Sequence, residues 1–346
     1  MGQPSAERTP GVYKRHSPRQ PLSAETLGVL PSRTQLEAAR ELISSRLWKT
    51  PLMPSRQLSS DSQRSVHLKL ECLSSIRSFK ARGAIWSLAG LGPEQRRAGV
   101  ITASTGNHGQ GVAYAGRLLG MDVSVVAPHS LDPVKRGAMQ SLGATVLIDG
   151  NDINESSDLA LQLARERGLT YIEDGEDAAL LAGAATVLWE MLEDRPDLDS
   201  VVVPVGGGNL IASCLWLAAV LDREIAITGV QSTFAPGTTL SWLNGTMTSA
   251  DCRTSAGGLA TSRPGALSLS VMNAFLETMI LVEEHELANA ISYALHNEGV
   301  VIEPAAAAGI AALRRFAQQM PGEMTGVILT GGWISASDLA RAVRAV

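Results

Sequence analysis

Short β-rich runs alternate with helical segments along most of the chain. Eight runs of aliphatic and β-branched residues predict strands: Val66–Leu70, Val100–Thr102, Val123–Ala127, Thr145–Ile148, Val201–Val205, Ile225–Val230, Met279–Val282 and Val327–Leu329. Apolar residues at helical spacing predict helices, among them Asn107–Leu119, Pro133–Ser141 and Asp177–Leu192. This alternation is typical of an α/β fold in which helices cover both faces of parallel sheets.

The N-terminal segment lacks this pattern. Residues 1–24 are rich in Pro, Ser and Arg, so the sequence predicts a disordered tail there. The remaining chain is long enough for about two domains. Because no glycine-rich linker separates them, we expect the second domain to be an insertion with tight connections.

Composition narrows the class of protein. A net charge of −5 argues against a nucleic-acid binder, which normally presents a basic face. No apolar run is long enough for a membrane span, and no secretory signal is visible. The three cysteines, Cys72, Cys214 and Cys252, lie far apart and are odd in number. They indicate reduced thiols in a cytoplasmic protein, and not a disulfide framework or a zinc site.

Several familiar motifs are incomplete. Gly206-x-Gly208 follows a predicted strand, but the third glycine of a dinucleotide fingerprint would fall at Ile211. His285-Glu286 resembles the start of a zinc-protease helix, yet the second histidine position is Asn289. No Gly-Lys pair is present, so a P-loop is excluded.

Three consecutive glycines suit an anion. Gly206, Gly207 and Gly208 come directly after the strand Val201–Val205, and Asn209 then opens a predicted helix. Such a loop lets backbone N–H groups turn inward, and the helix adds its positive end, which together favour a phosphate monoester. The alternative is a tight turn, for which one glycine would be enough.

A second polar segment lies between a strand and a helix. Ser104, Thr105 and the backbone of Gly106 can bind a carboxylate at the helix start, and Asn107 can bind an oxygen; His108 follows them. The alternative is helix capping, because Ser, Thr and Asn are all good caps.

A third segment, Ser78–Gly83, places a lysine at the start of a helix. An amine beside the aromatic Phe79 on a partly buried helix face is suited to covalent chemistry with an aldehyde. Lysines are scarce, and the other four are Lys14, Lys49, Lys69 and Lys135. A solvated surface lysine is the alternative, but the two anion-binding turns favour a role for Lys80.

Together the three segments resemble the fold-type II pyridoxal-phosphate enzymes, and most of all their threonine and serine dehydratase branch, including the hydroxyectoine-degradation dehydratase type. The resemblance covers about Leu27 to the C-terminus. It implies a tryptophan synthase β-like fold with two parallel-sheet α/β domains and the cofactor, pyridoxal 5'-phosphate, in the cleft. The large domain would comprise residues 25–96 and 173–346 and the small domain residues 97–172. A homodimer is also implied.

The resemblance assigns roles to individual residues. Lys80 would hold the cofactor and act as acid and base, Phe79 would pack beside the ring, and Asn107 would face the phenolic oxygen. The phosphate would lie among Gly206, Gly207, Gly208 and Asn209. Thr330 would bind the pyridine nitrogen. The substrate would contact Ser104, Thr105, Gly106, Asn107 and His108, with Thr105 at the position of a second base. The stretch Ala256–Ala260 and Glu303-Pro304 would line the pocket.

Departures from the family pattern bear on the substrate. Asn209, Gly257 and Trp333 replace the fourth glycine, an acidic residue and an asparagine that the resemblance leads us to expect. Gln231 occupies the position of a metal-binding carboxylate, so no tight divalent metal is predicted.

The expected activity is α,β-elimination on a small 3-hydroxy amino acid, such as threonine, serine or hydroxyaspartate, to a 2-keto acid and ammonia. Three alternatives stay open at this point: a β-replacement or γ-elimination synthase, an amino-acid racemase, and a non-catalytic binding protein. Because Lys80 is present, the last is disfavoured.

Overall fold

Two β-sheets organise the protein. The computed structural model describes residues 9–15, 18–175 and 177–344. The larger sheet has seven strands in the order β1-β10-β9-β8-β11-β3-β2. Their bounds are Gly11–Lys14 (β1), Leu52–Pro54 (β2), Ser65–Leu70 (β3), Ser200–Pro204 (β8), Ala226–Ser232 (β9), Thr278–Val282 (β10) and Met324–Leu329 (β11). The five central strands are parallel, whereas the edge strands β1 and β2 pair antiparallel.

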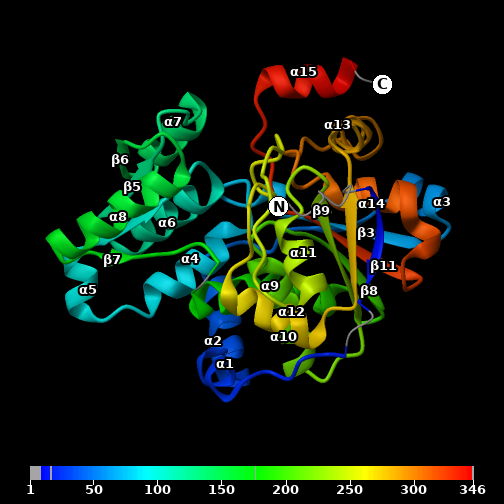
Figure 1. The fold of residues 1–346 in the computed structure, drawn as a ribbon, viewed down its shortest axis with the longest axis horizontal. Helices are drawn as coiled ribbons and strands as arrows, with labels where there is room; N and C mark the ends of the chain where they lie inside the picture. Colours follow the sequence, from blue (N-terminus) through cyan, green and yellow to red (C-terminus); the bar gives the residue numbers. More distant parts are fainter. Residues whose placement is uncertain (1–8, 16–17, 176, 345–346) are drawn as a thin grey trace, which may run out of the picture.

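The smaller sheet is entirely parallel and lies to one side of the larger one (Figure 1). Its order is β6-β5-β4-β7, with the strands Val100–Ala103 (β4), Val123–Ala127 (β5), Thr145–Ile148 (β6) and Thr170–Tyr171 (β7). Buried apolar residues form one core on each face of the larger sheet and two further clusters around the smaller one.

Helices connect the strands and cover the sheets. The α-helices are α1 (Ala24–Val29), α2 (Arg33–Ser44), α3 (Arg56–Ser62), α4 (Lys80–Ala89), α5 (Pro93–Ala98), α6 (Asn107–Leu119), α7 (Pro133–Ser141), α8 (Ile153–Arg167), α9 (Ala178–Asp194), α10 (Asn209–Val220), α11 (Gly237–Asn244), α12 (Ala266–Phe275), α13 (Glu284–Tyr293), α14 (Ala308–Phe316) and α15 (Ala336–Arg344).

The predicted α/β fold with two sheets is confirmed, and all eight predicted strands are present with small shifts at their ends. Three short strands were missed, namely β1, β2 and β7. The prediction of a disordered tail over residues 1–24 is wrong for Gly11–Lys14, which pair with Thr278–Leu281 of β10. It also fails at Ala24, where α1 begins, and residues 1–8 and 16–17 lie outside the described part of the chain. β1 was missed because it has only four residues within a segment rich in Pro, Ser and Arg, and its stability comes from pairing with β10.

The division into two domains at residues 97 and 172 stays a prediction. All four strands of the smaller sheet come from residues 100–171. Helix α4 precedes this range, however, and its apolar residues Ala84, Ile85 and Leu88 belong to the core around the smaller sheet.

Helix α4 is held against its neighbours by glycines. A Cβ atom on Gly83 would lie 2.8 Å from the carbonyl oxygen of Leu180, and one on Gly183 would lie 2.4 Å from that of Arg82. Helix α9 therefore packs backbone to backbone against α4, and larger residues would force them apart. On its other side α4 packs on α6, where a Cβ on Gly111 would lie 2.9 Å from the carbonyl oxygen of Lys80. The start of α4, where Lys80 lies, is thus fixed from two sides.

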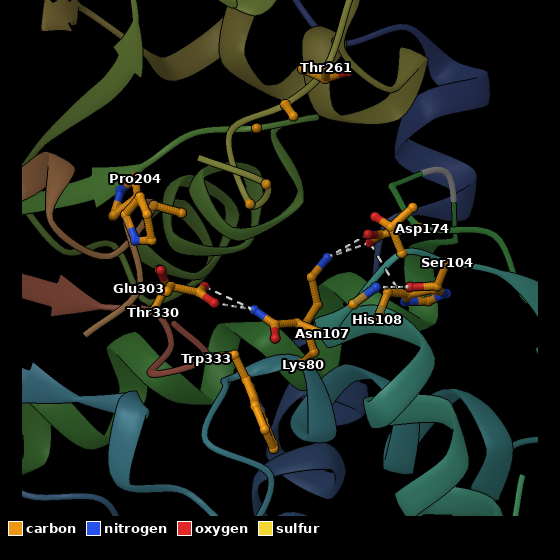
Figure 2. A pocket seen from close by; sticks show the side chains of 18 of the residues that line it. Lys80, Ser104, Asn107, His108, Asp174, Pro204, Thr261, Glu303, Thr330 and Trp333 are labelled. Carbon is orange, nitrogen blue, oxygen red and sulfur yellow. Dashed lines mark hydrogen bonds and ion pairs between the residues drawn. The ribbon is translucent and has the colours of Figure 1, made fainter. Parts of the chain in front are cut away.

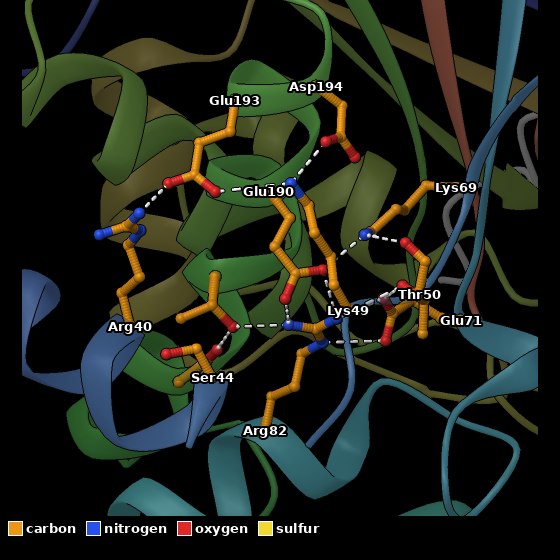
Figure 3. Close-up of polar contacts among 12 residues, drawn as sticks. Arg40, Ser44, Lys49, Thr50, Lys69, Glu71, Arg82, Glu190, Glu193 and Asp194 are labelled. Atoms are coloured by element: carbon orange, nitrogen blue, oxygen red, sulfur yellow. Dashed lines mark hydrogen bonds and ion pairs between the residues drawn. The ribbon is translucent and has the colours of Figure 1, made fainter. Parts of the chain in front are cut away.

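A buried ion cluster joins α4 and α9 to the larger sheet (Figure 3). Arg82 donates hydrogen bonds to both oxygens of Glu71 at 2.8 and 3.0 Å and to both oxygens of Glu190 at 2.7 and 2.8 Å. Lys69 donates to Glu190 at 2.5 Å and to the carbonyl oxygen of Thr50 at 2.8 Å. The charges of the two cations and two carboxylates cancel, which is needed because an unpaired buried charge is strongly destabilising. Lys69 is thereby committed to structure, despite its place on a strand that leads toward the site.

Candidate active site

A polar cavity of about 370 Å³ lies where the strands of both sheets end. The loops that follow β4, β8 and β11 all open onto it, because parallel strands direct their carboxyl ends to the same edge of a sheet. The structure brings together at this cavity the residues named from the sequence as cofactor or substrate contacts: Phe79, Lys80, Ser104, Thr105, Gly106, Asn107, His108, Gly206, Gly207, Gly208, Asn209 and Thr330. Of the stretch Ala256–Ala260, Ala256 and Leu259 are buried and do not line it.

Lys80 projects into the cavity from the first turn of α4 (Figure 2). Its ammonium nitrogen lies 5.3 Å from the centre of the Phe79 ring, within the range of a cation–π contact. The segment before it is pinned by backbone bonds: the Phe79 N–H donates to the carbonyl oxygen of Thr330 at 3.2 Å, and the Gly332 N–H donates to that of Arg77 at 2.9 Å. These two bonds tie the segment before Lys80 to the segment around Thr330, so the positions of the two residues relative to each other are fixed.

Asp174 pairs with Lys80, with its two carboxylate oxygens 2.5 and 2.7 Å from the ammonium nitrogen. Desolvation alone would raise the pKa of Asp174, but the charges of Lys80 and His108 and the hydrogen bond from Lys80 outweigh it and lower the pKa to about 2. The carboxylate is therefore ionised and keeps the lysine in place when no other group binds it.

The His108 ring packs beside the Lys80–Asp174 pair. Its ring is buried, with Nε2 3.3 Å from the carbonyl oxygen of Ile172 and Nδ1 3.7 Å from Asp174. Burial lowers the pKa of His108, and the nearby Lys80 charge lowers it further against the opposing effect of Asp174. His108 lines the cavity, and its ring contacts Ile172 and Asp174; the substrate contact named from the sequence stays a prediction.

The loop before α6 caps the helix through Ser104 and also leaves Thr105 exposed to the cavity. The Ser104 hydroxyl accepts hydrogen bonds from the N–H groups of Gly106 and Gly109 at 3.1 and 2.9 Å, which is a capping role. Thr105 is exposed to the cavity. Because the first N–H groups of a helix have no partner within it, the start of α6 can still receive a carboxylate.

Asn107 and Glu303 lie on the side of the cavity away from Asp174 (Figure 2). The Asn107 amide donates to both oxygens of Glu303 at 2.9 and 3.0 Å. Burial raises the pKa of Glu303, although the Asn107 hydrogen bond and the Lys135 charge act in the opposite direction. The Asn107 Oδ1 atom is buried and has no hydrogen-bond partner, so this amide has capacity for a further polar group.

The glycine loop is shaped for a close ligand. Gly208 adopts φ +96°, a left-handed conformation that favours glycine, immediately before α10 begins at Asn209. A Cβ on Gly206 would lie 2.5 Å from the carbonyl oxygen of Gly258, so no larger residue fits there. A Cβ on Gly207 would meet nothing within 4 Å, which leaves its backbone open to the cavity.

Trp333 lines the cavity but is anchored on its outer side. Its indole N–H donates to the carbonyl oxygen of Ile76 at 2.7 Å, and the guanidinium of Arg77 lies 5.5 Å from the ring centre. Arg77 has φ +55°, so the indole helps to hold a turn that few residues other than glycine and asparagine adopt.

Sequence reasoning missed four charged residues at the cavity, namely Asp132, Lys135, Asp174 and Asp338. Asp174 follows β7, a strand of two residues that is too short to be recognised from its pattern. Lys135 lies in the first turn of α7 and was interpreted as part of a polar helix start. The signal for Lys135 was available, because α7 follows the carboxyl end of the predicted strand Val123–Ala127.

Comparison with known proteins now defines the class. A family model described as pyridoxal-phosphate dependent enzyme matches residues 43–331. The chain is 32% identical over 309 residues to an L-threonine ammonia-lyase of Thermotoga maritima, covering 89% of this chain and 77% of the relative. It is 31% identical over 306 residues to the catabolic L-threonine dehydratase TdcB of Escherichia coli, covering 88% and 93%.

Solved structures agree. The processed threonine deaminase isoform 2 of Solanum lycopersicum has a TM-score of 0.89 at 27% identity and 98% coverage of both chains. A maize serine racemase has a TM-score of 0.85 at 25% identity, covering 90% of this chain and 97% of the other. The chain belongs to the pyridoxal-phosphate dependent enzyme family. Among the enzymes of that family it is similar to threonine ammonia-lyases.

The cavity fits the cofactor that the family implies. An amine that can bind an aldehyde, an open glycine loop at a helix start and a buried amide oxygen without a partner all face one space. The part of the chain that the structure describes contains no group of three or more His, Cys, Asp or Glu side chains arranged to hold a metal. Gln231 is buried, and its amide oxygen accepts hydrogen bonds from the N–H and hydroxyl of Thr239. Within the described ranges, no helix has the length and apolarity needed to cross a membrane.

Proposed function

We propose that this enzyme is a pyridoxal-phosphate-dependent ammonia-lyase that converts a small 3-hydroxy amino acid, of the serine, threonine or hydroxyaspartate type, to a 2-keto acid and ammonia. The observation that carries the proposal is the projection of Lys80 into a cavity that also contains the glycine loop and the start of α6. The relatives named as threonine ammonia-lyases and dehydratases support the same reaction.

The residues divide into a cofactor set and a substrate set. Lys80 would hold the cofactor covalently, the Gly206–Asn209 loop would bind its phosphate, and Thr330 and Asn107 would contact its ring. Pyridoxal phosphate, when bound, supplies an electron sink for the charge left at the substrate's α-carbon. The start of α6 would bind the α-carboxylate through backbone N–H groups.

Lys80 is the acid and base of the proposed reaction. Its amine would take the α-proton and would return a proton to the hydroxyl on the neighbouring carbon, which would leave as water. Asp174 and Phe79 limit where this amine can go, because one pairs with it and the other packs beside it. The released unsaturated amine reacts with water to give the keto acid and ammonia.

Racemisation is the second candidate, favoured by the similarity to serine racemases. It requires an acid or base on each face of the planar carbanion. The second position falls at Thr105, and no carboxylate, imidazole or amine of the described residues hydrogen-bonds its hydroxyl. Elimination needs one base and a leaving group, so the geometry favours it.

Product analysis tests the proposal. L-Serine, L-threonine and 3-hydroxyaspartate are each incubated with the purified holoenzyme in deuterated water, and keto acid, ammonia and the two enantiomers are quantified. We expect equal amounts of keto acid and ammonia and little deuterated D-isomer. Faster accumulation of D-isomer than of keto acid would favour a racemase, and no keto acid from any of the three would exclude the proposed reaction.

The role of Lys80 is tested separately by borohydride reduction of the holoenzyme and peptide mapping. The cofactor label should appear on Lys80 alone. Label on Lys69 would contradict its place in the buried ion cluster, and label on Lys135 would reassign the site. A homodimer and a cytoplasmic location remain predictions.

A further inference from the structure

Lys135 is the second lysine at the cavity, and the roles assigned above do not use it. It lies in the first turn of α7 and is half buried. A Cβ atom built on Gly106, in the loop before α6, would lie 3.6 Å from the Lys135 ammonium nitrogen. One built on Gly257 would lie 3.9 Å from the same nitrogen. Lys135 therefore reaches both the loop at the start of α6 and the loop that carries Gly257 on the other side of the cavity.

The charge of Lys135 lacks a close counterion. Lys49, Lys69 and Lys80 each pair with a carboxylate within 4 Å. Across the described ranges of the chain, no carboxylate lies that close to Lys135. Asp132 is near in sequence, but its carboxylate accepts hydrogen bonds from the backbone N–H groups of Val134 and Lys135 and caps α7.

The carboxylate of Glu303, which also lines the cavity, is already engaged. Glu303 is buried and accepts both hydrogen bonds from Asn107, and its pKa responds to the Lys135 charge. The cavity thus contains an ammonium group that faces polar space, next to the loop where a carboxylate is expected. A cation in this position stabilises an anion that enters from solvent.

We propose that Lys135 binds the α-carboxylate of the amino-acid substrate, together with the loop at the start of α6. This inference rests on the proposed function only for the identity of the ligand as an amino acid. The backbone N–H groups at the start of α6 would donate hydrogen bonds that orient the carboxylate, and Lys135 would supply a full positive charge. Because the ammonium stands at the edge of the cavity between the two loops, it also orients the amino acid with its carboxylate toward α6.

A non-reacting ligand pair isolates this contact. L-Alanine has the α-carboxylate but no leaving group, and L-alaninamide has the same shape without the charge. Dissociation constants are measured by titrating the cofactor absorbance of the holoenzyme. Wild type should prefer alanine, and Lys135→Gln should weaken alanine binding by about 10- to 100-fold with little effect on alaninamide. Lys135→Arg should retain most of the preference because it keeps the charge.

Gly257 offers a matched test that leaves Lys135 in place. Its backbone is outside the left-handed region, and the nearest atom to an added side chain is the Lys135 nitrogen at 3.9 Å. Gly257→Asp therefore puts a carboxylate beside Lys135, whereas Gly257→Asn adds the same bulk without charge. Alanine binding should be weaker in the Asp variant than in the Asn variant, and Lys135→Gln should abolish that difference.

Three results would overturn the proposal. Unchanged alanine affinity in Lys135→Gln, with a normal cofactor spectrum, would show that the ammonium does not bind the α-carboxylate. Loss of affinity for aspartate but not for alanine would assign Lys135 to a side-chain acid. Weakened retention of pyridoxal phosphate itself would assign it to the phosphate. Because alanine does not react, each outcome is independent of whether serine or threonine is eliminated.

Discussion

Replacing Arg82 by methionine should destabilise the protein strongly, because it leaves two buried carboxylates without their shared partner. Arg82 is 2% exposed and Glu71 is fully buried. The guanidinium also donates to the Thr186 and Thr50 hydroxyls at 3.1 and 3.4 Å, so its removal leaves several polar groups unsatisfied. Breaking a buried pair on one side costs about 3–5 kcal/mol of the free energy of unfolding.

The matched control is Lys69→Met, which removes the other cation of the cluster. Glu190 then keeps both hydrogen bonds from Arg82, so the loss should be smaller, about 1–3 kcal/mol. Urea unfolding followed by far-ultraviolet circular dichroism measures both. With a dependence on urea of about 3 kcal/mol per molar, the midpoint for Arg82→Met should fall by about 1–1.7 M.

The pH dependence of the stability deficit in Arg82→Met gives a second test of this account of the ion cluster. In wild type the Arg82 and Lys69 contacts hold the pKa of Glu190 below its ordinary value against the cost of its burial. In Arg82→Met the orphaned carboxylates should take up protons more readily, so the deficit relative to wild type should shrink as the pH falls from about 8 to about 5. An Arg82→Met midpoint no lower than that of Lys69→Met, or a deficit that is independent of pH, would refute this account of the cluster.

Three further predictions concern the cavity. Thr330→Asp should lower the elimination rate by about 10-fold or more, because a carboxylate would keep the cofactor's ring nitrogen protonated where a hydroxyl does not; steady-state kinetics that show an equal or faster rate would count against this contact. Trp333→Asn should change the ratio of serine to threonine turnover while the cofactor absorbance is retained, and an unchanged ratio would restrict Trp333 to holding the turn at Ile76. In cofactor-free protein, Asp174 contributes stability above its unfolded pKa, and this contribution is lost as the pH falls from about 4 toward the folded pKa of about 2. The thermal midpoint of Asp174→Asn should therefore lie below that of wild type at pH 7 and approach it near pH 2.5; a gap that persists would mean that the ion pair is not its cause.

The sequence by itself determined the fold class and the three segments of the site. The eight predicted strands are short runs of aliphatic and β-branched residues, so local pattern was sufficient to find them. The edge strands Gly11–Lys14 and Leu52–Pro54 escaped because runs of three or four residues carry too little pattern, and such strands are stabilised by the strand beside them. Lys80 and the glycine loop, which we propose to hold the cofactor, could be named from the sequence because such chemistry restricts a site to particular residue types in a particular order.

Only the tertiary structure decided what each charged side chain contacts. Lys69 lies in a predicted strand and Lys135 in the first turn of a predicted helix, and neither pattern shows that one is buried in an ion cluster while the other lines the cavity. Asp174 lies 94 residues from Lys80 in the chain and 2.5 Å from it in space. Such pairings depend on how the two sheets are placed around the cavity, and no local pattern records that placement. Electrostatic interactions act across space between side chains, so the partners of a charge follow from the packed fold and not from its neighbours in sequence.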